Sequence, residues 1–332
     1  MTARSLLAQP TLRVALLGIL AVVVAAAVIC AYFALEIRAY DVGKSRATAT
    51  VDGVVVEDRI GANEGIRVRW TDSRGRVHVQ WFGTYYPDDH RPGMSFGVAY
   101  DPGAEQPTGY ASDPDNDVKS DDLYFGAEAA VVVAVCLLGA WGFRGWWWRR
   151  GMRRASRPMT VVAYAAHRAM LPTSWLRLQT PSPDPEHTPT GILIRWQGVM
   201  WHPALDELSG PIDVLVKGDV NTRRRVVVEL PDGTLLWPRT RLRRREPRQV
   251  VERDAVREPL TAAFVVPAAG VLRPADSGWW RVPLLKVAIA GVIGAVIGAV
   301  LTSGAGAIVA SAAAAAGIAA FIWSFSGGEP RR

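Results

Sequence analysis

Four long apolar segments constrain the fold of this chain more than any other feature. They cover residues 12–35, 124–148, 284–301 and 305–325. An α-helix rises about 1.5 Å per residue, so about 20 apolar residues cross the roughly 30 Å hydrocarbon core of a membrane. The sequence therefore predicts an α+β membrane protein with four transmembrane helices, and it leaves the segments between them to form soluble modules.

Aromatic and basic residues at the ends of these segments indicate where the membrane surface lies. Tryptophan favours the level of the lipid headgroups, and arginine favours the cytoplasmic side just beyond it. The expected interface anchors are Trp146, Trp147, Trp148, Arg149, Arg150, Trp279 and Trp280.

The charge distribution predicts the orientation. Residues 36–123 carry 16 acidic and 10 basic residues, a net charge of −6, whereas residues 149–282 carry 13 acidic and 22 basic residues, a net charge of +9. Because basic loops stay in the cytoplasm, we expect the first stretch to be extracytoplasmic and the second to be cytoplasmic. The prediction is a multi-pass protein of the plasma membrane with both termini in the cytoplasm.

The first apolar segment has two interpretations. A basic residue followed by an apolar run is typical of a signal peptide, but this run is 24 residues long and no A-x-A cleavage site follows it, which favours an uncleaved helix. The remaining chain is then expected to divide into a cytoplasmic N-terminus at 1–11, an extracytoplasmic β module with an acidic, solvated linker at 36–123, a cytoplasmic basic β module at 149–242, a cytoplasmic tether at 243–283 and a cytoplasmic tail at 326–332.

Alternating apolar residues predict strands in the first module. Ile66, Val68 and Trp70 alternate with polar residues, and so do Val77, Val79 and Trp81 after the turn signal at 72–75. This pattern predicts a β-hairpin with one apolar face, in which Gly75 adopts a positive φ. Further strands are expected at 51–56 and 96–100. Four or five short strands suggest a small antiparallel barrel or sandwich.

The first half of the chain resembles a family of bacterial membrane proteins with a domain of unknown function. The resemblance rests on the strand near Val54, the motif VRWTDSRGRVHVQWFG and the strand Val98-Ala99-Tyr100-Asp101-Pro102 with its proline-containing tail. It covers roughly residues 15–145 and implies a small extracytoplasmic β module between two membrane helices. It brings no activity and no site residues. The prevalence of arginine over lysine also resembles an actinomycete protein.

The second module has the same kind of strand pattern and a dense group of arginines. Alternation near residues 160–164, 175–178, 192–196 and 212–216, and a hairpin around Pro231-Asp232-Gly233, predict antiparallel strands. The arginines either satisfy the positive-inside bias or contact anionic lipid headgroups, and nucleic acid is disfavoured because no nucleic-acid-binding motif accompanies them. The residues expected to contact anionic lipid are Arg223, Arg224, Arg225, Arg241, Arg243, Arg244 and Arg245.

Small residues recur at four-residue spacing in the last two apolar segments. Gly294 and Gly298 lie in one, and Gly306 and Ala310 in the other. Such spacing lets helix backbones approach closely. It favours packing within the hairpin over homodimerisation, although a homo-oligomer stays open.

Catalytic and cofactor motifs are absent from the sequence. The histidines lack metal-ligand spacing, and neither a nucleophile elbow nor a phosphate-binding glycine loop occurs. We therefore expect a protein without enzymatic activity, cofactor or metal, whose β modules dock unidentified protein partners on the two sides of the membrane. Strand addition to a sheet edge is one expected mode of docking. The alternative is an accessory subunit of a transporter or channel that uses the final helical hairpin.

Overall fold

A computed structural model describes residues 10–60, 65–168, 171–180, 193–208, 211–222, 224–247, 281–301 and 304–327. The chain divides into two compact units. One contains residues 26–133, and the other contains residues 1–25 together with 134–332.

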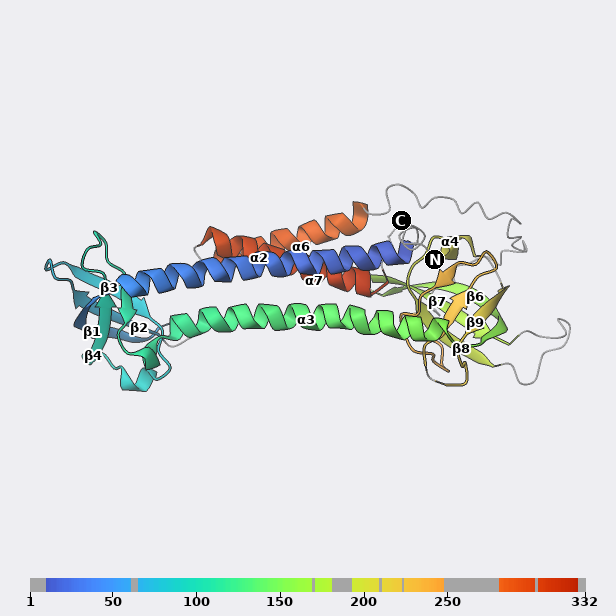
Figure 1. Cartoon of the computed structure of the whole chain (residues 1–332), viewed down its shortest axis with the longest axis horizontal. Coiled ribbons are helices and arrows are strands. Elements are labelled where there is room, and N and C mark those ends of the chain that lie inside the picture. The colour runs from blue at the N-terminus through green and yellow to red at the C-terminus, as the bar shows by residue number, and fades with distance from the viewer. Residues whose placement is uncertain are drawn as a thin grey trace. The chain divides into compact units, whose positions relative to one another are not determined.

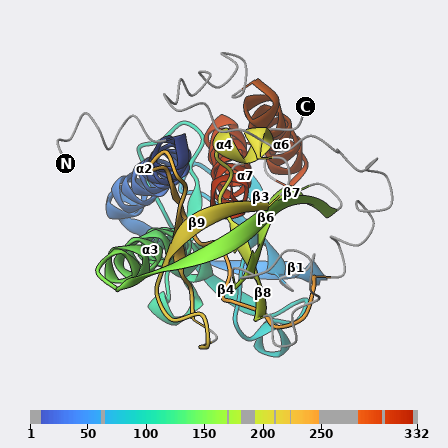
Figure 2. The ribbon, with the colours of Figure 1, turned by 90° about the vertical axis from the view of Figure 1, so that its right-hand side faces the viewer.

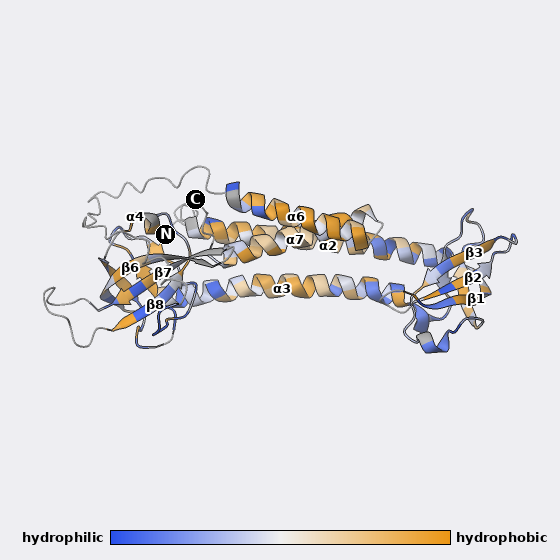
Figure 3. Ribbon diagram, turned by 180° about the vertical axis from the view of Figure 1, so that it is seen from behind, coloured by the Kyte–Doolittle hydropathy of each residue, from blue (hydrophilic) through white to orange (hydrophobic). Residues whose placement is uncertain are grey.

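Within the described residues, four helices are long and apolar enough to cross a membrane: α2 (Pro10–Arg46), α3 (Val118–Met152), α6 (Arg281–Leu301) and α7 (Ala305–Phe325). Figure 3 shows apolar residues along most of their length. None of the most apolar 18-residue window of α3 is buried inside the protein. A helix that is apolar on every side and uncovered by protein is stable in lipid rather than in water. The predicted α+β class with four apolar helices is confirmed.

Two of these helices extend beyond their apolar runs. α2 continues for eleven residues past Leu35, and α3 begins at Val118, within the expected acidic linker. The expected acidic linker is solvated only in part: Asp113, Asp115, Asp121 and Asp122 are exposed, whereas the side chain of Asp117 is buried and accepts hydrogen bonds from the Tyr40 hydroxyl and the Lys44 ammonium of α2. A buried carboxylate with two donors stabilises the start of a helix, which sequence periodicity does not reveal.

The first sheet belongs to the unit of residues 26–133 and has the strand order β3-β2-β1-β4-β5. Its strands are β1 (Ala49–Ile60), β2 (Gly65–Thr71), β3 (Val77–Phe82), β4 (Ser95–Tyr100) and β5 (Gly109–Ala111), with short 3₁₀ turns at Pro87–Asp89 and Pro114–Asn116. All neighbours are antiparallel. The inner face of the curled sheet is a core of large side chains: Val55, Ile66, Val68, Trp70, Phe82, Phe96, Val98 and Tyr100.

The hairpin of β2 and β3 forms where the sequence predicted it, but its apolar residues do not share one face. Trp70 lies opposite His78, and Val68 lies opposite Gln80. Residues directly opposite each other in an antiparallel pair point to the same side of the sheet. His78 and Gln80 therefore face the core, while Val77, Val79 and Trp81 face outward and are 62%, 53% and 44% exposed.

The length of the turn explains why His78 and Gln80 face the core. The Gly75 N–H donates to the Asp72 carbonyl (3.0 Å), the Asp72 N–H donates to the Arg76 carbonyl (3.0 Å), and Gly75 has φ +76°. Five residues, 72–76, thus separate the paired Thr71 and Val77. A loop one residue shorter or longer would turn the other side of β3 to the core, because side chains alternate with a period of two.

The second sheet belongs to the other unit and has the strand order β11-β10-β9-β6-β7-β8. Its strands are β6 (Ser156–Arg168), β7 (Leu171–Gln179), β8 (Ile194–Val199), β9 (Pro211–Lys217), β10 (Val227–Glu229) and β11 (Leu235–Leu236), and a short helix α4 (Ala204–Glu207) follows β8. Figure 2 looks onto this sheet. The predicted hairpin at Pro231-Asp232-Gly233 is confirmed, with Gly233 at φ +82°.

The second sheet packs directly on helix ends within its own unit. Trp148 of α3 stacks on Trp237 with 4.3 Å between ring centroids, and both belong to a cluster with Val14 of α2 and Phe325 of α7. Three hydrogen bonds tie the end of α7 to this region: Arg144 Nη1 to Phe325 O (2.7 Å), Arg239 Nη1 to Ser326 O (3.1 Å) and Trp201 N to Gly327 O (2.9 Å). Figure 1 shows α3 ending beside this sheet.

The second module also extends past its expected boundary. Arg243, predicted to begin the tether, exchanges two backbone hydrogen bonds with Trp196 of β8 (2.8 and 2.9 Å) and so belongs to the module. Most of the predicted tether, residues 248–280, lies outside the described residues, and its last three residues, 281–283, belong to α6.

The last two helices pack through small residues. A Cβ atom at Gly294 would lie 2.5 Å from the Ser311 carbonyl oxygen, and one at Gly298 would lie 3.0 Å from the Ile308 Cα. Such contacts leave no space for a side chain, so the backbones of α6 and α7 approach closely here. Ala310 is buried, whereas Gly306 is exposed.

Candidate functional site

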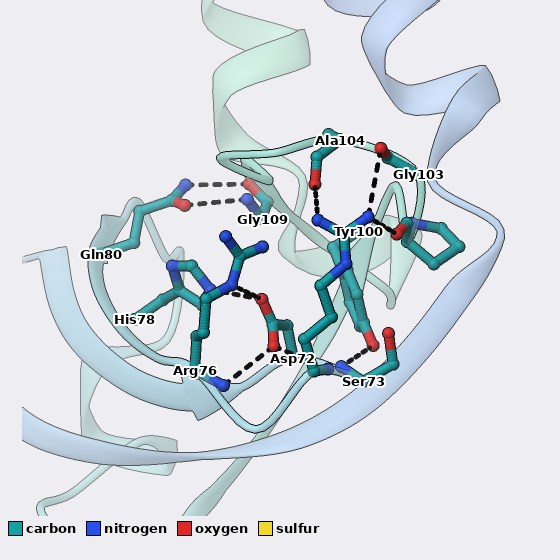
Figure 4. Close-up of polar contacts among 11 residues, drawn as sticks. Asp72, Ser73, Arg76, His78, Gln80, Tyr100, Gly103, Ala104 and Gly109 are labelled. Atoms are coloured by element: carbon teal, nitrogen blue, oxygen red, sulfur yellow. Dashed lines mark hydrogen bonds and ion pairs between the residues drawn. The ribbon is translucent and has the colours of Figure 1, made fainter.

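A buried carboxylate organises the turn between β2 and β3 (Figure 4). The Asp72 side chain is 2% exposed and accepts from the Arg74 N–H, the Arg76 N–H and Arg76 Nε, each at 2.9 Å. His78 Nε2 donates to the same carboxylate at 3.0 Å, and the His78 ring stacks on Trp70. Four donors around one buried carboxylate satisfy its charge.

These contacts determine the ionisation of Asp72. Burial by itself raises the pKa of Asp72, but the hydrogen bonds from His78, Arg76 and Arg74 outweigh it and hold the pKa well below its usual range. The side chain is a carboxylate at every physiological pH. Because its lone pairs are occupied by the turn, this cluster stabilises the hairpin and is a poor general base.

The same hairpin closes the curled sheet through a side chain. Gln80 of β3 reaches across the inner face to Gly109 of β5, where its amide donates to the carbonyl and accepts from the N–H, both at 2.8 Å (Figure 4). The amide group takes the place of a neighbouring strand for Gly109. A Cβ at Gly109 would lie 2.8 Å from Val98, so only glycine permits this approach.

The outer face of β3 is an exposed apolar surface of the first sheet. Val77, Val79 and Trp81 lie beside Thr71, Arg69 and Arg67 of β2, and β3 is an edge strand. A stripe of apolar residues on an edge strand is a liability unless another surface covers it. The β3 stripe, defined as Val77, Val79 and Trp81, is the first candidate site.

A cavity beside the second sheet is the second candidate. It has a volume of about 370 Å³ and is lined by Phe143, Trp147, Thr222, Arg224, Arg225 and Arg241. Phe143 and Trp147 lie four residues apart on α3 and therefore share one face of the helix. The arginines come from the loop between β9 and β10 and from the segment after β11. We call this the arginine cavity.

Backbone and side-chain hydrogen bonds hold the arginine-bearing segments together. The Leu242 N–H donates to the Arg224 carbonyl at 3.2 Å, which places Arg241 beside the β9–β10 loop. Buried Gln197 fixes the end of that loop, because its Nε2 donates to the Val226 carbonyl at 2.8 Å. The Thr222 hydroxyl donates to the Asp219 carbonyl at 2.9 Å. These hydrogen bonds thus hold the arginine-bearing segments in place.

The arginine cavity concentrates positive charge. No carboxylate among the described residues forms an ion pair with Arg224, Arg225 or Arg241. Burial, and then repulsion from Arg241, lowers the pKa of Arg225. The Arg225 Nε and Trp147 Nε1 donors are buried and have no acceptor in the described part of the chain. An anion bound in the cavity would offset the charge.

The predicted lipid-contact arginines divide into several groups. Arg224, Arg225 and Arg241 line the arginine cavity, while Arg244 and Arg245 are exposed outside it. The guanidinium of Arg243 lies 5.3 Å from the ring centroid of Trp175, a cation–π arrangement. Arg223 lies outside the described residues.

The predicted interface anchors also take different positions. Trp146 is exposed with Arg150 over its ring at 5.5 Å, and Arg149 is exposed. Trp148 is instead packed on Trp237, and Trp147 lines the arginine cavity. Trp279 and Trp280 lie outside the described residues. Two of the three tryptophans predicted to be interfacial, Trp147 and Trp148, thus serve the cavity or packing in addition to any contact with lipid.

Two residues that line the cavity, Phe143 and Thr222, were not predicted from the sequence. Phe143 and Thr222 carried no charge or motif that marked them. The four-residue spacing of Phe143 and Trp147 was the available signal, but every face of α3 is apolar, so the spacing did not stand out.

Among the described residues, no group of three or more acidic, histidine or cysteine side chains is arranged to hold a metal ion. No protein-family model, curated protein or solved structure that was compared with the chain matches it. The family resemblance drawn from residues 15–145 therefore stays a prediction.

Proposed function

We propose that this chain is a membrane interaction protein without enzymatic activity, with β modules on opposite sides of the plasma membrane. If α2 and α3 each cross the membrane once, the first sheet, which lies between them in the chain, is on one side. The second sheet, which follows α3, is then on the other side. The charges of −6 and +9 favour the first sheet outside and both termini in the cytoplasm.

The β3 stripe is the observation that carries the docking role. Its three apolar side chains are between 44% and 62% exposed although polar residues of the same strand, His78 and Gln80, are turned inward. A strand that turns its polar residues to the core and its apolar residues to solvent is typical of an interface. Because Gln80 already bridges β3 to β5, we favour docking on the outer face over strand addition.

Photo-crosslinking in intact cells tests the proposal. A photoreactive amino acid at position 79 is expected to give a discrete adduct, whereas the same group at exposed Gln106, in the loop before β5, is expected to give none. An adduct with a different protein supports the docking role. An adduct with a second copy of the chain would mean that the stripe docks another copy and that the chain forms a homo-oligomer. Equal yields at the two positions would reject it.

Topology is tested separately. A reporter that is active only outside the cytoplasm is expected to be active when fused after residue 110 and silent when fused after residue 245. The reverse pattern would invert the orientation. The alternative role as a transporter accessory stays a prediction, and solute flux into liposomes that contain the purified chain would favour it.

A further inference from the structure

We propose that the arginine cavity binds the phosphate group of an anionic phospholipid from the membrane leaflet next to the second sheet. The proposal rests on the membrane insertion proposed above. It goes beyond general attraction of a basic surface, because it assigns one bounded site with specific donors.

The lining of the cavity combines charged and apolar side chains. It includes three arginines, Arg224, Arg225 and Arg241, and two aromatic residues, Phe143 and Trp147. Arginine forms charge-assisted, frequently bidentate hydrogen bonds with phosphate oxygens. A lining of guanidinium groups and aromatic rings fits a ligand with one charged and one apolar part.

Two residues of the cavity lining also have an unpaired donor. Arg225 and Trp147 both line the cavity, and Arg225 Nε and Trp147 Nε1 are buried and have no acceptor in the described ranges. A buried donor without an acceptor costs about 1–3 kcal/mol. A phosphate has enough oxygens to accept from more than one donor.

The location of the cavity favours a lipid over a free phosphate. Phe143 and Trp147 lie in the last turns of α3, a helix apolar enough to cross a membrane, and Phe143 is 57% exposed. Phe143 therefore belongs both to the cavity lining and to the exposed surface of α3, where acyl chains would lie. The cavity volume of about 370 Å³ lies near the lower end of the usual range for small-molecule sites, about 300–1,000 Å³.

Lipid titration of the purified full chain tests the site. Native mass spectrometry would count dioleoyl phosphatidylglycerol molecules bound to the detergent-solubilised protein, with phosphatidylcholine as the zwitterionic comparison. The cavity variant Arg225→Gln/Arg241→Gln is expected to lower the affinity for phosphatidylglycerol about tenfold or more. The matched control Arg244→Gln/Arg245→Gln removes the same charge from exposed residues outside the cavity and is expected to change it less than about twofold.

A milder variant keeps the test independent of folding defects. Trp147→Phe removes the N–H donor while retaining an aromatic ring, and we expect affinity to fall about threefold. The melting temperature of each variant, followed by far-ultraviolet circular dichroism, should match that of the unmodified chain in all variants that enter the comparison.

The proposal would be overturned if the cavity and control variants weakened phosphatidylglycerol binding equally, or if the chain bound the two lipids with equal affinity. It would also be overturned if neither Trp147→Phe nor Arg225→Gln/Arg241→Gln changed the affinity, or if millimolar inorganic phosphate displaced the lipid. The last outcome would identify free phosphate as the ligand. Carbonate extraction separates this proposal from the proposed function. A chain that resists extraction but lacks lipid selectivity refutes only the cavity, whereas a chain that is extracted refutes the membrane role as well.

Discussion

The two sheets differ in how their charged side chains are paired. Around the first sheet, carboxylates accept from basic neighbours inside the same unit: Asp72 from Arg76 and His78, Asp117 from Lys44, and Glu57 from Arg67 (2.7 Å). In the described part of the second sheet, Lys217 pairs with Glu229 at 2.6 Å, while the arginines of the cavity face other arginines and aromatic rings.

This difference indicates what each module requires. The first sheet satisfies its buried charges internally and leaves an apolar stripe, so its expected partner is an apolar protein surface. The second sheet buries most of its apolar residues in a core of its own, packs Met200 and Trp237 against helix ends, and leaves cationic donors, so its expected partner is an anion. Two curled antiparallel sheets in one chain thus present surfaces of opposite chemical character.

The largest expected effect comes from removing the carboxylate at the centre of the first hairpin. Asp72→Ala leaves four donors without their acceptor, and we expect the melting temperature of the first module to fall by roughly 10 °C or more. Hydrogen–deuterium exchange should accelerate in β2 and β3 and stay unchanged in the second sheet. Asp88→Ala, which removes an exposed ion pair with Arg59, serves as control and should have little effect. A similar loss in both variants would contradict the central role of Asp72.

Acid should affect the second sheet before the first. Burial lowers the pKa of His202 to about 4, although Asp232 partly opposes this. Since the unfolded pKa is about 6.5, the stability from neutral His202 is present above pH 6.5 and is lost as the pH falls toward 4, a change of about 3 kcal/mol. Asp72 also has a lowered pKa, but its contribution persists until the pH falls below about 4.

Hydrogen exchange measured against pH would check this order. The Ala204 N–H donates a hydrogen bond to His202 Nδ1 at 3.2 Å. His202→Asn keeps an acceptor for this N–H but removes the titrating group. The variant should flatten the pH dependence of the second sheet between pH 6.5 and 4. Loss of the first sheet at higher pH than the second would reverse the predicted order.

A smaller effect is expected where Gln80 bridges the edges of the first sheet. Gln80→Ala removes the two hydrogen bonds to Gly109 and should lower the free energy of unfolding of the first module by about 1–2 kcal/mol. Exchange of the Gly109 amide should accelerate most. Protection of that amide at the wild-type level would show that Gln80 does not close the sheet.

The smallest expected effect tests the register of β3. Val79→Ala removes an exposed side chain and should change stability by less than about 0.5 kcal/mol. Val68 on the neighbouring strand is fully buried, so Val68→Ala should lower the free energy of unfolding by about 2–3 kcal/mol. Equal costs would mean that both strands turn their valines to one core, contrary to the observed pairing.

The sequence by itself determined the approximate positions of the long helices and of several strands. The bounds of α7 agree with its apolar segment, 305–325, and those of α6 begin three residues before its segment, 284–301. Strands β2, β3, β4 and β9 form where alternation predicted them. Local periodicity suffices here because helix and strand impose different spacings on the residues that share a face.

Only the tertiary structure decided which faces and which distant segments meet. Alternation in β3 was visible in the sequence, but the five-residue turn determined that Val79 points outward and Gln80 points toward Gly109. The arginine cavity likewise joins α3 to loops about 75 to 100 residues further along the chain. Periodicity reports on neighbours within one element, whereas register and docking depend on long-range packing that no local pattern encodes.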